Sequence, residues 1–338
     1  LAPHWPRGRS SKSQIRKTFP EMFFLNVNGG RKMDTKKRPI IIDTDPGIDD
    51  AVALAIALNH PNLEVRLITT VAGNVDVEKT TNNALKLVDF FGKKVPVAKG
   101  CNCPLLIQLE DSAEIHGETG MDGFEFPQPI STCLDIHAVE AMRKEILSSD
   151  VPLTIVPIAA LTNIALLLTL YPEVKENIAE IVMMGGSLAR GNTNTSAEFN
   201  TYVDPHAAQI VFQSGVPLTM VGLDVTSQAV LTNHEVTAIR ALGRVGEMFY
   251  GLFRHYRGGS LTTGLKMHDV CAIAYLTSPE LFETTETFIE VALEGPAAGA
   301  TVADLKMKYH KNTNAVACID VNVEAFQKWV VEKMKAVN

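Results

Sequence analysis

Short apolar runs that alternate with segments of helical periodicity are the feature that most constrains this chain. From Pro39 onward the runs are almost continuously apolar, and helical patterns separate them. Strands that are apolar on both faces are typical of parallel sheets covered by helices. The sequence therefore predicts one α/β domain with a mostly parallel, Rossmann-like central sheet between two layers of helices. The predicted strands are 40–42, 65–71, 95–98, 153–158, 181–184 and 218–223, and the predicted helices are 50–58, 77–91, 136–147, 161–170, 205–212, 268–276 and 323–334.

The amino-terminal segment differs in charge from the rest of the chain. Residues 1–38 carry ten Lys or Arg and two Asp or Glu, whereas the whole chain has a net charge of −7. The segment has neither strand nor helix periodicity. We interpret residues 1–37 as a disordered or non-native extension and residues 38–338 as the catalytic domain. A targeting peptide is the alternative interpretation of the extension.

Several classes of protein are disfavoured by composition. No apolar run reaches the roughly 18–20 residues that span a bilayer, so no membrane association is expected. The acidic net charge argues against a nucleic-acid partner. The five cysteines are odd in number and lack zinc-site spacing, which favours reduced thiols in a cytoplasmic protein.

Four aspartates lie within eight positions where the first strand ends and the first helix begins. They are Asp43, Asp45, Asp49 and Asp50. Asp49 or Asp50 could simply cap the helix, but capping does not explain Asp43 and Asp45. Crowded carboxylates repel one another unless a cation or shared protons compensate. An oxygen-only cluster favours a hard cation, Ca²⁺ or Mg²⁺.

Two other functions remain compatible with this acidic segment. A magnesium-dependent phosphatase would use Asp43 or Asp45 as its nucleophile. A sugar- or nucleoside-binding protein without turnover would use the same fold. Phosphate-binding glycine motifs and a GxSxG elbow are absent from the sequence, which disfavours P-loop, dinucleotide-binding and acyl-hydrolase folds.

The segment PIIIDTDPGIDDA resembles the amino-terminal signature of the nucleoside hydrolase family. Further segments resemble the family in the family's order, from about residue 38 to the carboxyl terminus. They are TTVAGN at 69–74, HGETG at 116–120, LTNIA at 161–165, MMGG at 183–186, AEFN at 197–200, GLDVT at 222–226 and MHD at 267–269. The resemblance implies hydrolysis of the N-glycosidic bond of ribonucleosides in nucleoside salvage or catabolism. It looks closest to bacterial enzymes that accept both purine and pyrimidine nucleosides.

The resemblance also implies a role for each matching residue. One Ca²⁺ per subunit would be bound by Asp45, Asp50, Asp269 and the main-chain carbonyl of Ile158. Asp45 would activate a calcium-bound water, and Asp43 would support it. Inversion at the anomeric carbon is expected. The ribose-binding set would be Asp49, Asn74, Met184, Asn192, Glu198 and Asn200.

The departing base needs a hydrogen-bond or proton donor. His268 matches the family's leaving-group histidine, and His116 lies in a loop that matches one closing near the base. Tyr256 falls near the expected base pocket, although 254–266 is where family members differ most. Each of these residues could instead be structural. The resemblance further implies a homodimer or homotetramer.

Overall fold

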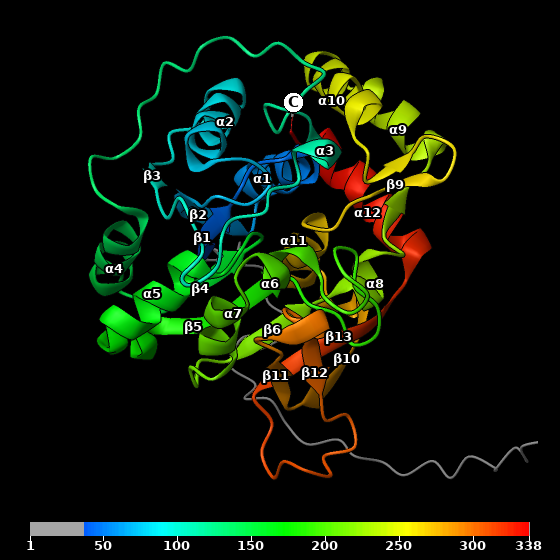
Figure 1. Cartoon of the computed structure of the whole chain (residues 1–338). Coiled ribbons are helices and arrows are strands. Elements are labelled where there is room, and N and C mark those ends of the chain that lie inside the picture. Colours follow the sequence, from blue (N-terminus) through cyan, green and yellow to red (C-terminus); the bar gives the residue numbers. More distant parts are fainter. Residues whose placement is uncertain (1–36, 338) are drawn as a thin grey trace, which may run out of the picture. The chain divides into compact units, whose positions relative to one another are not determined.

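Eight strands form one sheet in the order β10-β13-β6-β5-β4-β1-β2-β3, and every pair in it is parallel except β10–β13 (Figure 1). The computed structural model describes residues 37–337. The interpreted extension, residues 1–37, lies almost entirely outside this range. The strands are β1 (Arg38–Thr44), β2 (Leu63–Thr70), β3 (Val97–Lys99), β4 (Leu153–Pro157), β5 (Ile178–Met184), β6 (Leu218–Val221), β10 (Phe282–Thr287) and β13 (Ala315–Val321).

Two apolar cores hold the helices against the sheet. Alternate residues of β1 divide between them, since Ile40 and Ile42 belong to one core and Ile41 to the other. The first core joins the sheet to α1 (Ile48–Asn59), α2 (Val77–Phe90), α9 (Asn233–Arg240), α10 (Arg244–His255), α11 (Val270–Thr277) and α12 (Val323–Lys335). The second joins it to α4 (Ala138–Ser148), α5 (Thr162–Leu170) and α7 (Pro205–Phe212). The predicted α/β architecture is confirmed.

The predicted elements are all present, with ends shifted by a few residues, but several others were not predicted. The antiparallel edge formed by β10 and β13 was not predicted. The strand β10 (FETTET) is polar at most positions and lacks an apolar run, whereas the apolar start of β13 (AVACIDV) was overlooked. The helices α9 and α10 were missed as well. The short helices α3 (Ala113–His116), α6 (Phe199–Val203) and α8 (Leu223–Thr226) were not predicted either. The segment of α3 was interpreted as a loop, and the first residue of α8 was placed at the end of a predicted strand.

Two small antiparallel sheets flank the main one. They are β7 (Val230–Leu231), β9 (Gly264–Lys266) and β8 (Gly259–Ser260) in that order, and the hairpin of β11 (Ile289–Val291) with β12 (Thr301–Ala303). Three short 3₁₀ helices are Pro172–Asn177, Pro279–Leu281 and Gly295–Ala297.

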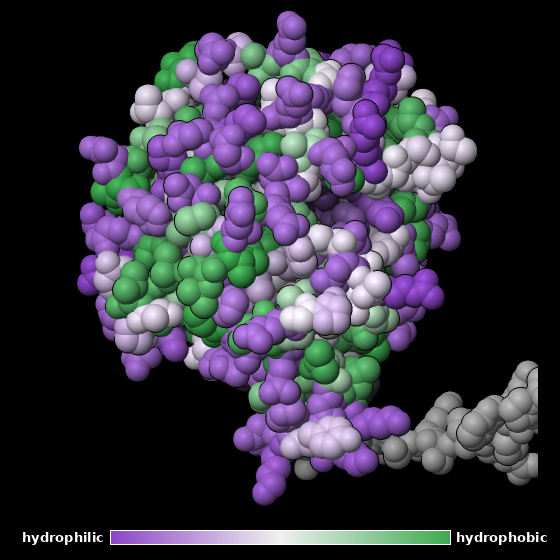
Figure 2. Space-filling model, in the orientation of Figure 1, coloured by the Kyte–Doolittle hydropathy of each residue, from purple (hydrophilic) through white to green (hydrophobic). Residues whose placement is uncertain are grey.

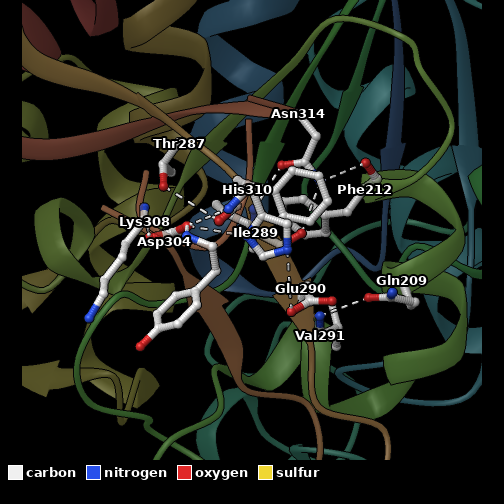
Figure 3. A network of polar contacts seen from close by, with 12 residues as sticks. Gln209, Phe212, Thr287, Ile289, Glu290, Val291, Asp304, Lys308, His310 and Asn314 are labelled. Carbon is white, nitrogen blue, oxygen red and sulfur yellow. Dashed lines mark hydrogen bonds and ion pairs between the residues drawn. The ribbon is translucent and has the colours of Figure 1, made fainter. Parts of the chain in front are cut away.

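The β11–β12 hairpin is held by side chains that bind backbone groups (Figure 3). Asn314 exchanges two hydrogen bonds with the backbone of Ile289, and Gln209 of α7 accepts one from the N–H of Val291. The carboxylate of Asp304 accepts three backbone N–H groups of residues 308–310, which lower its pKa to about 2. The hairpin is therefore fixed to α7. Its Thr301 bonds both the N–H and the carbonyl of Ser187, just beyond the end of β5.

Hydrophilic residues cover most of the face in Figure 2, with hydrophobic residues gathered near α5 and β5. Within residues 37–337, no helix combines the length and apolar character needed to cross a membrane.

Candidate active site

A cavity of about 570 Å³ opens where the parallel strands end at their carboxyl edge. Turns after β1, β2, β4 and β5 contribute to its wall, together with segments around residues 111–116, 192–200 and 256–269. Ligands of open α/β sheets bind at this edge. The predicted site residues that line it are Asp45, Asp49, Asn74, His116, Ile158, Met184, Asn192, Glu198, Asn200, Tyr256, His268 and Asp269. Asp50 lies buried beside them.

Buried carboxylates dominate one end of the cavity. One oxygen from each of Asp49, Asp50 and Asp269 lies within 4.8 Å of the others. Burial raises the pKa of Asp49 to about 7 with the Asp50 charge adding to the effect, and burial followed by the Asp49 charge raises the pKa of Asp269. In the described part of the chain, no Lys or Arg forms an ion pair with these three. A cation would relieve this repulsion.

The carboxylate of Asp50 is held by three donors. The Thr44 hydroxyl donates to Oδ1 at 2.6 Å, and the Gly47 N–H and Asn74 Nδ2 donate to Oδ2 at 2.9 and 3.2 Å. The Gly47 bond follows from the start of α1, where Asp50 is the third helical residue. Asp50 thus caps its helix and also turns toward the acidic cluster, so the capping and cluster interpretations both hold for it.

Asp45 has one bonded and one free carboxylate oxygen. Its Oδ2 accepts the N–H of Asn74 at 2.6 Å, while Oδ1 is buried without a hydrogen-bond partner. Burial and the charge of Asp50 raise its pKa well above the usual range. A buried carboxylate oxygen without a donor costs free energy unless a cation or bound molecule contacts it. Asp45 does not belong to the trio of closely spaced carboxylates, in which Asp49 stands instead.

Asp43 is fully buried behind the cavity and does not line it. Its Oδ1 accepts the Thr69 hydroxyl and, at 2.8 Å, Asn163 Nδ2. Burial raises its pKa to about 7. A carboxylate in this position cannot reach a substrate, which argues against a phosphatase that uses Asp43 as its nucleophile.

The opposite wall offers hydrogen-bonding groups whose orientation the backbone fixes. Glu198 begins α6, and its carboxylate accepts the N–H groups of Gly186, Asn200 and Thr201 at 2.9–3.2 Å. Burial raises the pKa of Glu198 to about 7. Asn200 donates its Nδ2 to the carbonyl of Met184 at 3.1 Å, which leaves its Oδ1 as an acceptor.

Two other predicted residues also have protein partners. The side-chain oxygen of Asn192 accepts the N–H of Phe199 at 2.9 Å, which ties this loop to the start of α6. Ile158 follows β4, and its N–H donates to the carbonyl of Asp43 at 2.8 Å. This bond extends the pairing of β1 and β4 into the cavity wall.

His116 is fixed as a neutral hydrogen-bond donor. Its Nδ1 accepts the N–H of Ile48 at 3.1 Å, so the hydrogen of a neutral ring is carried by Nε2. Burial lowers its pKa to about 3, with His268 adding to the effect. A side chain at Gly47 would overlap the ring, since a Cβ there would lie 2.4 Å from Nδ1.

Tyr256 and His268 complete this end of the cavity. The ring centres of Tyr256 and His116 are 5.4 Å apart. The Tyr256 side chain also lies near the acidic end, where the Asp49 charge adds to the effect of burial in raising the pKa of Tyr256 well above its usual range. Nδ1 of His268 lies 2.8 Å from the hydroxyl of Thr226, and burial lowers the pKa of His268 to about 4.

Sequence reasoning missed several residues of the cavity wall. Ser112, Arg257 and Lys266 line it, and Thr44 bonds Asp50 beneath it. Thr44 stands between Asp43 and Asp45, so its position in the acidic signature could have indicated it. The other three lie in loops or in a three-residue strand without a distinguishing pattern.

The chain is similar to proteins that cleave nucleosides. Residues 40–328 match the family described as inosine-uridine preferring nucleoside hydrolase. The non-specific ribonucleoside hydrolase RihC of Klebsiella pneumoniae (strain 342) is 49% identical over 295 residues, which cover 87% of this chain and 97% of the relative. RihC of Salmonella typhimurium is 49% identical over 294 residues, 87% of this chain and 96% of the relative. The solved purine-preferring ribonucleoside hydrolase from Gardnerella vaginalis superposes with a TM-score of 0.83 at 33% identity, covering 89% of this chain and 99% of that chain.

Proposed function

Because the chain belongs to the inosine-uridine preferring nucleoside hydrolase family, we propose that its cavity splits ribonucleosides into base and ribose with one bound calcium ion. Membership makes the chain a nucleoside hydrolase. The calcium ion and the residue roles are our proposal. The observation that carries it is the buried oxygen Oδ1 of Asp45, which has no protein partner beside three closely spaced carboxylates.

The donor set fits a calcium ion. It contains only oxygen and is buried, and no Lys or Arg of the described residues forms an ion pair with it, although Arg257 and Lys266 line the same cavity. We propose Asp45, Asp50, Asp269 and the carbonyl of Ile158 as the ligands. Asp49 is the residue grouped with Asp50 and Asp269, but Asp45 has a buried carboxylate oxygen without a hydrogen-bond partner, so we propose Asp45 rather than Asp49 as the ligand. Calcium would supply coordination positions for ribose hydroxyls and would lower the pKa of a bound water molecule.

Asp45 acts as the general base in this proposal. Its Oδ1 accepts a proton from the water that attacks the anomeric carbon, while Asn74 holds Oδ2 in place. Asp49, Glu198 and the Oδ1 of Asn200 accept hydrogen bonds from ribose hydroxyls, and Met184 packs against the sugar. The carboxylates also stabilise positive charge that develops on the ring. Water would attack the anomeric carbon from the face opposite the departing base, so we expect inversion of configuration at that carbon.

At the other end, His116 and His268 face the departing base. Since Nδ1 of His116 is occupied by Ile48, His116 offers the base its Nε2–H as a hydrogen bond rather than a proton from a charged ring. This donor stabilises negative charge on the leaving base. His268, with its ring held at Thr226, is also kept neutral by burial, so we propose that it too assists the departing base by hydrogen bonding; Tyr256 borders the same space.

The setting of the enzyme is part of the proposal. The five free cysteines favour a cytoplasmic location. A role in nucleoside salvage or catabolism, and assembly into a homodimer or homotetramer, are proposed from the family resemblance.

The proposal is tested by metal removal. We expect ribose release from uridine and inosine to fall after chelation and to return with added calcium. Asp269→Asn should fold but fail to regain activity at calcium concentrations that saturate the unaltered enzyme, because one buried carboxylate is lost. Asp150→Asn, an exposed change at the end of α4, is the matched control. Full activity in a chelated enzyme, or normal calcium dependence of Asp269→Asn, would contradict the proposal.

A further inference from the structure

Ser112 connects the two ends of the cavity. Its hydroxyl donates to Oδ1 of Asn74 at 2.8 Å, and its N–H donates to the Asn74 carbonyl at 3.2 Å. A serine at the start of a helix ordinarily caps that helix with its own oxygen. Ser112 occupies this position in α3 but makes no such bond. Its hydroxyl is instead committed to a residue 38 positions away.

The orientation of the Asn74 amide is determined by other contacts. Its Nδ2 faces two acceptors, the carbonyl of Asp45 at 3.1 Å and Oδ2 of Asp50 at 3.2 Å, so Oδ1 must face Ser112. The backbone N–H of Asn74 also donates to Asp45. Asn74 therefore remains attached to the acidic end through three bonds even without the Ser112 hydroxyl.

On its other side, Ser112 begins the short segment that carries His116. Its carbonyl accepts the N–H groups of Ile115 at 2.8 Å and His116 at 3.4 Å. Among the described residues, the hydrogen bond that ties the His116 ring to the acidic end comes from the Ile48 N–H. The segment is thus fastened to that end at two places, namely Ser112 on Asn74 and His116 on Ile48.

We propose that Ser112 is a positioning residue for nucleoside hydrolysis, which holds His116 over the departing base by anchoring its segment to Asn74. The inference rests on the proposed role of His116. The proposal makes full activity depend on Ser112, although Ser112 does not itself contact the reacting atoms.

A pair of variants of equal shape isolates the hydroxyl. Ser112→Thr keeps it, and Ser112→Val replaces it by a methyl group. Loss of one neutral hydrogen bond should lower kcat of Ser112→Val on inosine and uridine roughly tenfold, with Ser112→Thr within about threefold of the unaltered enzyme. With p-nitrophenyl riboside, whose leaving group needs no assistance, both variants should match the unaltered enzyme. Ser148→Val, which removes an exposed hydroxyl at the end of α4, is the control.

The double variant Ser112→Val with His116→Ala decides whether Ser112 acts through His116. If it does, the double variant loses no more activity than His116→Ala alone. The inference would be overturned if the activity losses of the two single variants multiplied in the double variant. Equal kinetics of Ser112→Thr and Ser112→Val, or an equal loss of activity on p-nitrophenyl riboside, would overturn it as well. Failure of the unaltered enzyme to release ribose would instead reject the proposed function. Thermal unfolding of each variant separates loss of fold from loss of positioning.

Discussion

The close approach of Gly73 to Asp45 gives a sharp test of the proposed general base. A Cβ added at Gly73 would lie 2.1 Å from Oδ2 of Asp45. The Gly73 backbone lies outside the left-handed region, so alanine is allowed there and the effect is purely steric. Since an ordinary contact begins at 3.4 Å, Gly73→Ala forces the carboxylate to retreat by about 1.3 Å, the difference between the two distances.

This displacement should abolish most of the activity. Misplacement of a reacting group by about 1 Å costs on the order of 100-fold in rate. We therefore expect kcat of Gly73→Ala on inosine and uridine to fall roughly 100-fold, with destabilisation of about 1–3 kcal/mol from overpacking. The assay is steady-state ribose release at saturating calcium, combined with urea unfolding.

Gly100→Ala is the matched control. A Cβ there would lie 2.4 Å from the Asn163 amide and from the Thr70 carbonyl, also at a strand end but outside the cavity. It should destabilise the protein comparably and reduce kcat much less. If Gly73→Ala kept kcat within threefold, or if both variants lost activity equally, Asp45 would not be the position-sensitive base.

Two further predictions concern binding and pH. Glu198→Gln places an amide NH₂ among three backbone N–H donors, so KM for both nucleosides should rise at least roughly tenfold. An unchanged KM would exclude Glu198 from ribose binding. The exposed change Glu118→Gln is the control. Burial and the Lys333 charge lower the pKa of His60 to about 4, so the folded protein keeps it neutral while the unfolded chain takes up a proton below pH 6.5. The free energy of unfolding should therefore fall as the pH is lowered from 6.5 to 4. In urea titrations at each pH, His60→Asn should reduce that fall by about 1–2 kcal/mol. The same pH dependence of the free energy of unfolding in both proteins would contradict this prediction.

The acidic end of the site was predictable because most of its carboxylates lie close together in the sequence. Asp45, Asp49 and Asp50 follow one buried strand, and Asn74 follows the next, so the parallel sheet brings them together. Asp269 is remote in sequence and was found only through the family resemblance. Its place beside Asp50 depends on the packing of α11 against α1, which no local pattern reveals.

The order within the acidic cluster was less predictable than its presence. The family resemblance implies Asp45 as a ligand and Asp49 as a ribose contact, yet Asp49 has the closer spacing to Asp50 and Asp269. Side-chain rotation about one bond decides which oxygen faces which neighbour, and the sequence carries no information about that rotation. The approach of Tyr256 to Asp49 is such a detail, because Tyr256 lies more than 200 positions away.

The two ends of the cavity differ in how the chain builds them, and this difference bears on specificity. The proposed ribose end is made of strand ends and of the Glu198 carboxylate, which backbone N–H groups hold in place. The proposed base end is made of two segments, one around His116 and one around Tyr256. The Arg257 N–H donates to the Ile115 carbonyl between them, and the rings of His116 and Tyr256 are in contact. Ribose is common to every nucleoside, whereas purine and pyrimidine bases differ in size. A rigid ribose end with a sparsely joined base end can therefore keep the reacting bond in place while the base varies, and base preference should follow from how firmly residues such as Ser112 hold the His116 segment.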